Sequence, residues 1–177
     1  MISLIRNGLK SEISKKGEYQ MKTYLPTEKC TKCKGRCCRQ MPGICHPDDI
    51  ARMFPANLFL DSINKALKTK KFCIDWYEDS HGGNHYMRPS VKGSEGVVYH
   101  PAWYGECVFL THTGCSLGFE TRPFTCKTLK PSDDKECISS IEENEKLFMA
   151  KIWDKTDVDL RRLQIRTQEN IKRSLIF

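Results

Sequence analysis

The sequence predicts a small α+β domain, irregular in shape and stabilised by metal, with short antiparallel strands and flanking helices. Ten of the 177 residues are cysteines, and several stand at the spacing that metal ligands use. Residues 71–78 alternate between apolar and polar side chains, as in a β-strand. Segments with helical periodicity lie on both sides of that strand. The length fits one such domain.

The first helices are predicted from their end signals. Residues 1–28 show a weak helical pattern, and we expect an N-terminal arm or helix there. The run His-Pro-Asp-Asp at 46–49 opens a helix, because proline fits the first helical position and the two acids face the positive end of the dipole. Pro55 ends this helix, and a second helix is expected over residues 57–68.

The strands are predicted from alternation and turn residues. Residues 71–78 should form a half-buried strand, and the glycine-containing turn at 80–84 should lead into a returning strand at 85–88. Short strands are also expected at 97–99 and 107–110. The middle of the chain is therefore predicted to be a hairpin with small additions.

The C-terminal part is predicted to be helical. Serine and glutamate stand three residues apart at 139 and 142, and again at 140 and 143, which is the spacing of a capping box. A last helix should follow Thr156. We divide the chain into an N-terminal arm or helix (1–28), a cysteine-cluster metal-binding domain (29–138) and C-terminal helices packed on it (139–177).

Composition and charge limit the compartment and the kinds of partner expected for this protein. No apolar stretch reaches the ~20 residues of a membrane span, and the N-terminus lacks the features of a signal peptide. We therefore expect a cytoplasmic protein without membrane contact, in a reducing compartment where structural disulfides are rare. The net charge of +7 leaves a nucleic-acid or protein partner open. Because the basic residues are spread out, solvated surface and compensation for a thiolate site explain the charge better.

Four cysteines fall within nine residues and form the main candidate site. Cys30 and Cys33 are spaced so that one turn presents both sulfurs to one ion. Cys37 and Cys38 are adjacent, and adjacent side chains diverge, so both rarely serve one tetrahedral ion. We call the segment from Cys30 to Cys38 the knuckle. It predicts two metal sites that share these cysteines, or a polynuclear centre.

The later cysteines can complete the ligand shells. Four of them follow in the second half of the chain, which makes eight ligands, the number for two four-thiolate sites. Cys73 is left out as a buried or half-buried free thiol in a strand, and Cys45 is left out with its ligation open. His112 could instead supply a nitrogen ligand. The predicted metal ligands are Cys30, Cys33, Cys37, Cys38, Cys107, Cys115, Cys126 and Cys137.

All-thiolate sites suit both zinc and iron–sulfur clusters, so the sequence hardly discriminates between these two metal groups. We favour two zinc ions, with a 4Fe–4S cluster as the alternative. Cationic side chains near the cysteines would balance the thiolate charge, namely those of Lys32, Lys34, Arg36, Arg39 and Arg122.

One ordered set of motifs resembles a known family. The chain reads C-x2-C-x3-C-C, then an acidic helix start, then G-x-C-x-F-L, a further cysteine and R-P-x-x-C. This order resembles the YkgJ-type cysteine-cluster family, described as zinc- or iron-chelating. The family usually has arginine after the last motif, where this chain has Lys127. The matching residues are Cys30, Cys33, Cys37, Cys38, Gly105, Cys107, Phe109, Leu110, Cys115, Arg122, Pro123 and Cys126.

The resemblance implies a metal-binding module and little mechanism. A similar module occurs in flagellin lysine N-methylases, which look like iron–sulfur proteins that use S-adenosylmethionine. No phosphate-binding loop, dinucleotide fingerprint or HExxH motif is present. We expect a metal-binding protein whose sites are structural or accessory. The alternatives are an iron–sulfur-dependent redox or methyl-transfer enzyme, or a basic module that binds nucleic acid or protein.

Overall fold

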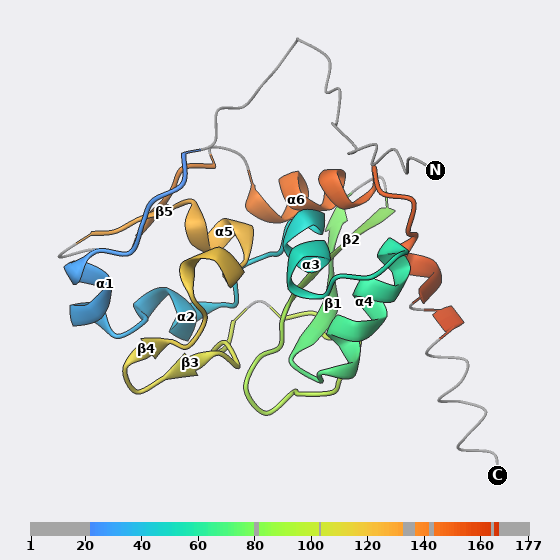
Figure 1. The fold of residues 1–177 in the computed structure, drawn as a ribbon. Helices are drawn as coiled ribbons and strands as arrows, with labels where there is room; N and C mark the ends of the chain where they lie inside the picture. The colour runs from blue at the N-terminus through green and yellow to red at the C-terminus, as the bar shows by residue number, and fades with distance from the viewer. Residues whose placement is uncertain are drawn as a thin grey trace, which may run out of the picture.

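The computed structural model confirms a small α+β domain. It describes residues 22–79, 82–102, 104–132, 137–141, 144–163 and 165–166. Within these ranges, six α-helices accompany three antiparallel strand pairs. Most of the expected N-terminal arm and the last residues of the expected C-terminal helix lie outside the described residues. The elements gather at two ends, a hairpin end and a cysteine end (Figure 1).

The hairpin end is built on two paired strands, as predicted. β1 (Phe72–Asp79) pairs with β2 (Gly82–Pro89) over eight residues each. The expected half-burial of β1 is wrong for its first part, where residues 72–75 are all buried, while Trp76 and Tyr77 are half-buried. A neighbouring segment covers them: Ile74 N donates to Val98 O at 2.7 Å, and His100 N donates to Ile74 O at 3.1 Å. The strand expected at 97–99 is this segment, held by one bridge.

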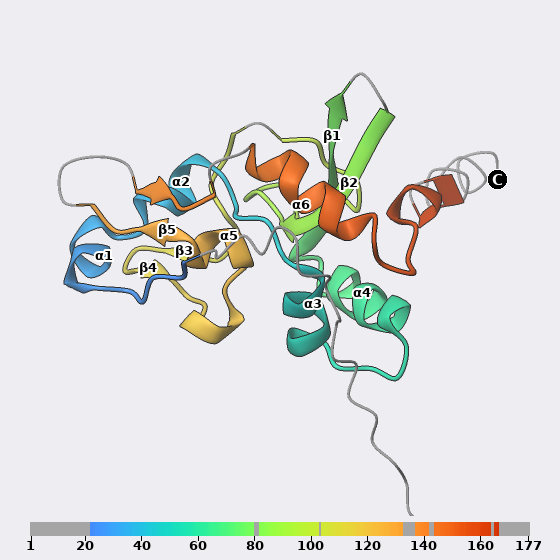
Figure 2. The same ribbon diagram turned by 90° about the horizontal axis from the view of Figure 1, so that it is seen from above.

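Three helices surround the hairpin and close the hydrophobic core. α6 (Glu145–Trp153) lies across β1 and β2, while α3 (Pro47–Met53) packs on α4 (Phe59–Lys68) (Figure 2). The indole Nε1 of Trp153 donates to Cys45 O at 2.8 Å. The prediction of a helix opening at His-Pro-Asp-Asp is confirmed, and α4 begins two residues later than expected.

The cysteine end contains short elements only. The strand expected at 107–110 is reduced to β3, and Cys107 makes a single bridge to Val91. The elements here are α1 (Glu28–Cys33), α2 (Arg36–Gln40), β3 (Leu110–Thr111), β4 (Gly114–Cys115), the 3-10 turn η1 (Phe119–Thr121), α5 (Phe124–Lys127), β5 (Leu129–Lys130) and β6 (Ile138–Ser139).

The entry into α6 differs from the predicted capping box. Ser139 lies in β6, and the N-cap of α6 is Asn144, whose side chain accepts from the backbone of Lys146 and Leu147. The predicted partners Glu142 and Glu143 lie outside the described residues. No helix in the described ranges is both long and apolar enough to span a membrane.

Candidate metal centre

The knuckle is two short helices joined by a left-handed turn. α1 places Cys30 and Cys33 on one turn, and the Cys33 thiol donates to Cys30 O at 3.3 Å. Lys34 and Gly35 both have positive φ, of 51° and 81°. Glycine is needed at the second position, because a Cβ there would lie 2.6 Å from Leu110 Cδ1. The turn joins α1 to α2, and both helices contact β4.

Backbone hydrogen bonds attach the second cysteine segment to this knuckle. Cys107 N donates to Cys38 O at 2.7 Å, and Gly105 N donates to Gln40 O at 2.8 Å. The hairpin of β3 and β4 then pairs Leu110 with Cys115. Two cysteines far along the chain are thereby placed beside α2.

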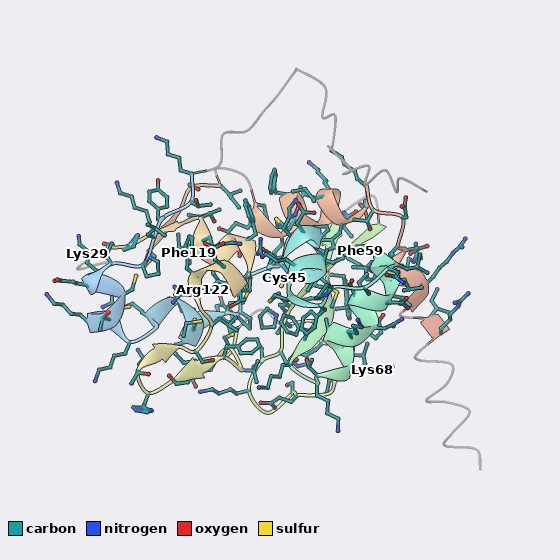
Figure 3. All side chains as sticks on the ribbon, viewed as in Figure 1. Lys29, Cys45, Phe59, Lys68, Phe119 and Arg122 are labelled. Carbon is teal, nitrogen blue, oxygen red and sulfur yellow. The ribbon has the colours of Figure 1, made fainter. Side chains whose placement is uncertain are left out.

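Cys38 and Cys107 are buried in one small cluster with Leu110, and Cys37 and Cys115 pack against it. The neighbouring thiols raise the pKa of Cys38, while their proximity to Cys38 lowers the pKa of Cys37 to about 7 and that of Cys115 to about 6. Arg122, at the cysteine end in Figure 3, lowers the pKa of Cys115 further. Thiolates are the form that binds metal, so the group has ligand character.

Cys126 adjoins this group from α5. Its sulfur lies against the Cα of Gly43, in the space that a side chain at position 43 would fill. Burial raises the pKa of Cys126, and the charges of Cys37, Cys107 and Cys115 raise it further. α5 therefore adds a fourth chain segment to the site.

Cys137 approaches from the segment before β6 and faces the knuckle. It is half-buried, as are Cys30 and Cys33. Burial raises the pKa of Cys137, and the nearby charges of Cys37, Cys30 and Cys33 add to this. The structure thus places both Cys137 and Cys126 beside the cavity that Cys37 and Cys38 line.

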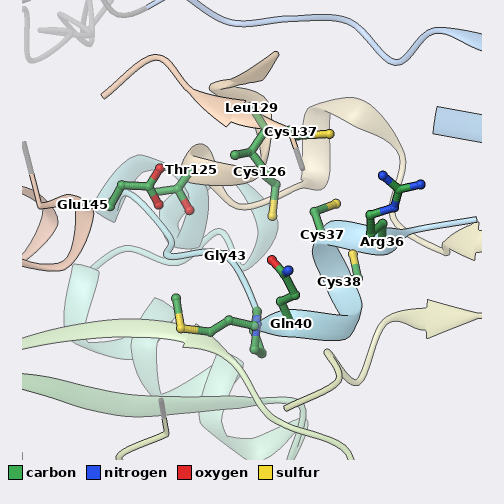
Figure 4. A pocket seen from close by; sticks show the side chains of 12 residues that line it. Arg36, Cys37, Cys38, Gln40, Gly43, Thr125, Cys126, Leu129, Cys137 and Glu145 are labelled. Atoms are coloured by element: carbon green, nitrogen blue, oxygen red, sulfur yellow. The ribbon is translucent and has the colours of Figure 1, made fainter. Parts of the chain in front are cut away.

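A cavity of about 140 Å³ opens beside these sulfurs. Cys37, Cys38, Cys126 and Cys137 line it on one side, and Glu145 lines it on the other (Figure 4). The Oε1 atom of Glu145 is buried, and the described residues offer it no hydrogen-bond partner. Burial raises the pKa of this carboxyl group.

The residues left out of the ligand set lie in other environments. Cys45 and Cys73 are fully buried, and Cys45, labelled in Figure 3, belongs to the hydrophobic core of the hairpin end. Burial raises the pKa of both thiols, to about 11 for Cys73. His112 is exposed in the turn between β3 and β4.

The fit of a metal rests on donor chemistry and grouping. Within the described part of the chain, no three histidine, cysteine or acidic side chains already surround a common point as ligands. The cysteines nonetheless converge from separate segments, and sulfur-only donor sets suit zinc and iron–sulfur clusters. The residues present therefore fit either group.

Sequence reasoning missed the residues that hold the cysteines in place. Asp49 was interpreted only as a helix-start acid, yet its carboxylate binds Lys127 at 2.9 Å across the chain. Lys127 was noted only for its departure from the family pattern. Gly43 drew no attention, although Pro-Gly before a helix could have indicated a close backbone approach.

Comparison with known proteins identifies the family. The family model described as "CxxCxxCC: Putative zinc- or iron-chelating domain" matches residues 29–149, well over half of the chain. No curated protein and no solved structure gives a significant match. The match covers the knuckle and every other predicted ligand, and it confirms the resemblance in the motifs. The chain belongs to the CxxCxxCC family of zinc- or iron-chelating domains.

Proposed function

We propose that this protein holds two zinc ions, each in a four-thiolate site, and that their role is structural or accessory. The cysteine group around Cys38 carries the proposal, because α2, the chain at Cys107 and β4 each bring a cysteine to one small buried cluster. The proposed ligands are Cys38, Cys107, Cys115 and Cys126 for one ion, and Cys30, Cys33, Cys37 and Cys137 for the other.

The division of the knuckle follows from the neighbours of each cysteine. Cys38 packs with Cys107 and Cys115, while burial, and then the charges of Cys37, Cys30 and Cys33, raise the pKa of Cys137. Adjacent cysteines on a helix diverge, so Cys37 and Cys38 suit different ions. This grouping supports two sites with a shared knuckle.

Bound zinc would supply folding free energy by joining segments that are distant in sequence. The cysteine end needs such a link, because its strands are two residues long and α5 has four residues. Isolated helices and hairpins of this size are marginal in water. The geometry thus supports a structural role for the metal.

Metal analysis of anaerobically purified protein tests the identity of the metal. We expect a colourless protein with about two zinc ions per chain. A brown preparation that absorbs near ~400 nm and contains iron and acid-labile sulfide would overturn the zinc assignment.

Separate serine substitutions test the shared knuckle. Cys37→Ser and Cys38→Ser should each lose about one of the two zinc equivalents, because each removes a ligand from a different ion. Cys73→Ser is the matched control, since its thiol is fully buried in β1 and is no proposed ligand. If either knuckle variant retains full metal content and stability, the two-site assignment is wrong.

The cavity favours one second candidate, an iron–sulfur-dependent redox enzyme with a small substrate. A volume of about 140 Å³ resembles the ~150 Å³ cavity that holds benzene, and lies well below the ~300–1,000 Å³ of most cofactor pockets. A nucleoside cofactor therefore does not fit, which weighs against methyl transfer there. The buried Oε1 of Glu145 would accept a hydrogen bond from the substrate.

Spectroscopy separates this candidate from the first. If the anaerobic protein holds a cluster, small molecules with N–H donors should perturb its electron paramagnetic resonance spectrum, and Glu145→Gln should reduce the effect. A zinc-only protein, or a cluster spectrum that no small donor changes, excludes the candidate.

A further inference from the structure

The carboxylate of Asp49 is a buried junction between two distant segments. Asp49 is 2% exposed and lies in the first turn of α3. Its Oδ1 accepts from Arg52 Nη2 at 2.6 Å and from Lys127 Nζ at 2.9 Å. Its Oδ2 accepts from the backbone N–H of His46 at 2.9 Å and of Phe124 at 2.6 Å. Two of these four donors come from α3 and its cap, and two come from α5.

The two donors from α5 stand on either side of a proposed ligand. Phe124 is the first residue of α5, Lys127 is the last, and Cys126 lies between them. The residue before the helix, Pro123, provides no side-chain cap. The Phe124 N–H would lack a partner within its helix, and Asp49 satisfies it from 75 residues away. A helix of four residues cannot hold its own shape, so its position depends on such contacts.

The chain just before α3 holds the same helix from the other side. Ile44 N donates to Thr125 Oγ1 at 2.8 Å, and Thr125 N donates to Ile44 O at 3.2 Å. Gly43 lies under the Cys126 sulfur. The segment from Gly43 to Asp49 therefore contacts each of the four residues of α5.

We propose that Asp49 is a positioning residue for Cys126, whose carboxylate fixes α5 so that this sulfur faces the other thiols. The proposal rests on the proposed function, in which Cys126 is a metal ligand. Charge balance explains the role of Lys127: a buried carboxylate needs a partner, and the ammonium group provides it within α5 itself. Losing the Asp49 charge leaves the Lys127 ammonium buried without its counter-charge, and losing Lys127 removes one of the two contacts between Asp49 and α5.

Zinc release from the loaded full-length chain to a chromogenic chelator tests this proposal. In Asp49→Asn, one of the two zinc equivalents should leave at least about tenfold faster, while the other leaves at the wild-type rate. Asparagine keeps the shape of the side chain, but it loses the charge that pairs with Lys127. Lys127→Met should accelerate the release of the same zinc equivalent. Lys127→Arg keeps the positive charge, so it should release that zinc at nearly the wild-type rate.

The matched control is Asp75→Asn. Asp75 is also 2% exposed and pairs with a buried cation, Arg88, but it lies in the hairpin. This variant should lose stability, but the release rates of the two zinc equivalents should not differ from each other more than in the wild-type protein. If Asp49 only stabilised the fold, Asp49→Asn would likewise lose stability without making one zinc equivalent leave faster than the other. Faster release of one zinc equivalent alone therefore identifies Asp49 as a positioning residue.

Several outcomes would overturn the proposal. The proposal is wrong if Asp49→Asn and Lys127→Met both release zinc at the wild-type rate. It is also wrong if both zinc equivalents leave faster by the same factor. If Asp49→Asn does not fold, Lys127→Met decides alone, because Asp49 then keeps Arg52 as a partner. Cys126→Ser separates this failure from that of the proposed function. A Cys126→Ser protein that retains both zinc equivalents shows that the ligand set is wrong.

Discussion

Gly43 lies directly beneath the sulfur of Cys126, which fills the space that any side chain at position 43 would need. Gly43→Ala should therefore push Cys126 away from the thiol group. We expect the loss of about one zinc equivalent, together with an overpacking cost of about 1–3 kcal/mol in the free energy of unfolding. Metal analysis and urea denaturation of the purified variant measure both effects.

Gly118→Ala provides the matched control for this substitution. Gly118 has φ −60°, and among the residues that the structure describes, a Cβ there would meet only Thr121 Oγ1, at 3.9 Å. The variant should keep its full zinc content and its stability. If Gly43→Ala behaves like Gly118→Ala, the close approach seen between Gly43 and Cys126 does not hold the sulfur in place.

The pair of Asp75 and Arg88 should dominate the stability of the hairpin end. Arg88 is fully buried; its Nε donates to Asp75 Oδ2 at 2.7 Å, and its Nη2 donates to His100 O at 2.6 Å. Removing the carboxylate in Asp75→Asn leaves a buried guanidinium without its counter-charge, which should cost about 3–5 kcal/mol in the free energy of unfolding.

A double variant checks that this cost comes from the unpaired charge. Asp75→Asn combined with Arg88→Met should be more stable than the sum of the two single effects predicts, because neither charge then remains unpaired. Urea denaturation of the four proteins measures the coupling. Additive effects would show that the two side chains stabilise the hairpin independently.

Local signals in the sequence predicted the hairpin end better than the cysteine end. The alternation over 71–78 and the His-Pro-Asp-Asp run act within a few residues, and both gave elements that the structure contains. Cys107 did not begin a long strand, because its backbone pairs with Cys38 and Val91 rather than with a neighbouring strand. Pairing across such distances leaves no periodic pattern in one sequence.

The candidate site shows the same division. Cysteine spacing indicated which side chains carry ligand chemistry, since that property belongs to each residue. The contact between Asp49 and Lys127 joins residues 78 positions apart, and neither residue has an unusual local pattern. Sequence reasoning therefore found the proposed ligands and missed the carboxylate that connects α3 to α5.

His46 should make stability depend on pH near neutrality. Its Nδ1 caps α3 by accepting from Asp48 N at 3.1 Å, which requires the neutral ring. Burial lowers the pKa of His46 below 6.5, against the smaller opposing effect of Asp48. The folded state thus binds the proton less well than the unfolded state. The contribution of His46 is complete above pH 6.5, and it falls as the pH drops from there through the folded-state pKa.

Comparison with His46→Asn isolates this effect. Asparagine is a good N-cap and does not titrate, so the variant should lose less stability on acidification. The difference in unfolding free energy between the two proteins should grow below pH 6.5, by up to about 1 kcal/mol, the usual value of an N-cap. Urea denaturation at a series of pH values measures it. Parallel curves for the two proteins would contradict the capping role of the neutral ring.

Cys45 and Cys73 should be the last thiols to react with iodoacetamide. Both are fully buried, and burial raises their pKa values, so little thiolate is present at neutral pH. We expect the zinc-loaded protein to react slowly at every cysteine, because metal protects the proposed ligands. Partial chelation that leaves the circular dichroism native should then expose the ligand thiols first, as peptide mapping by mass spectrometry can show. Early labelling of Cys45 would place it among the ligands instead, since it would share their response to metal removal.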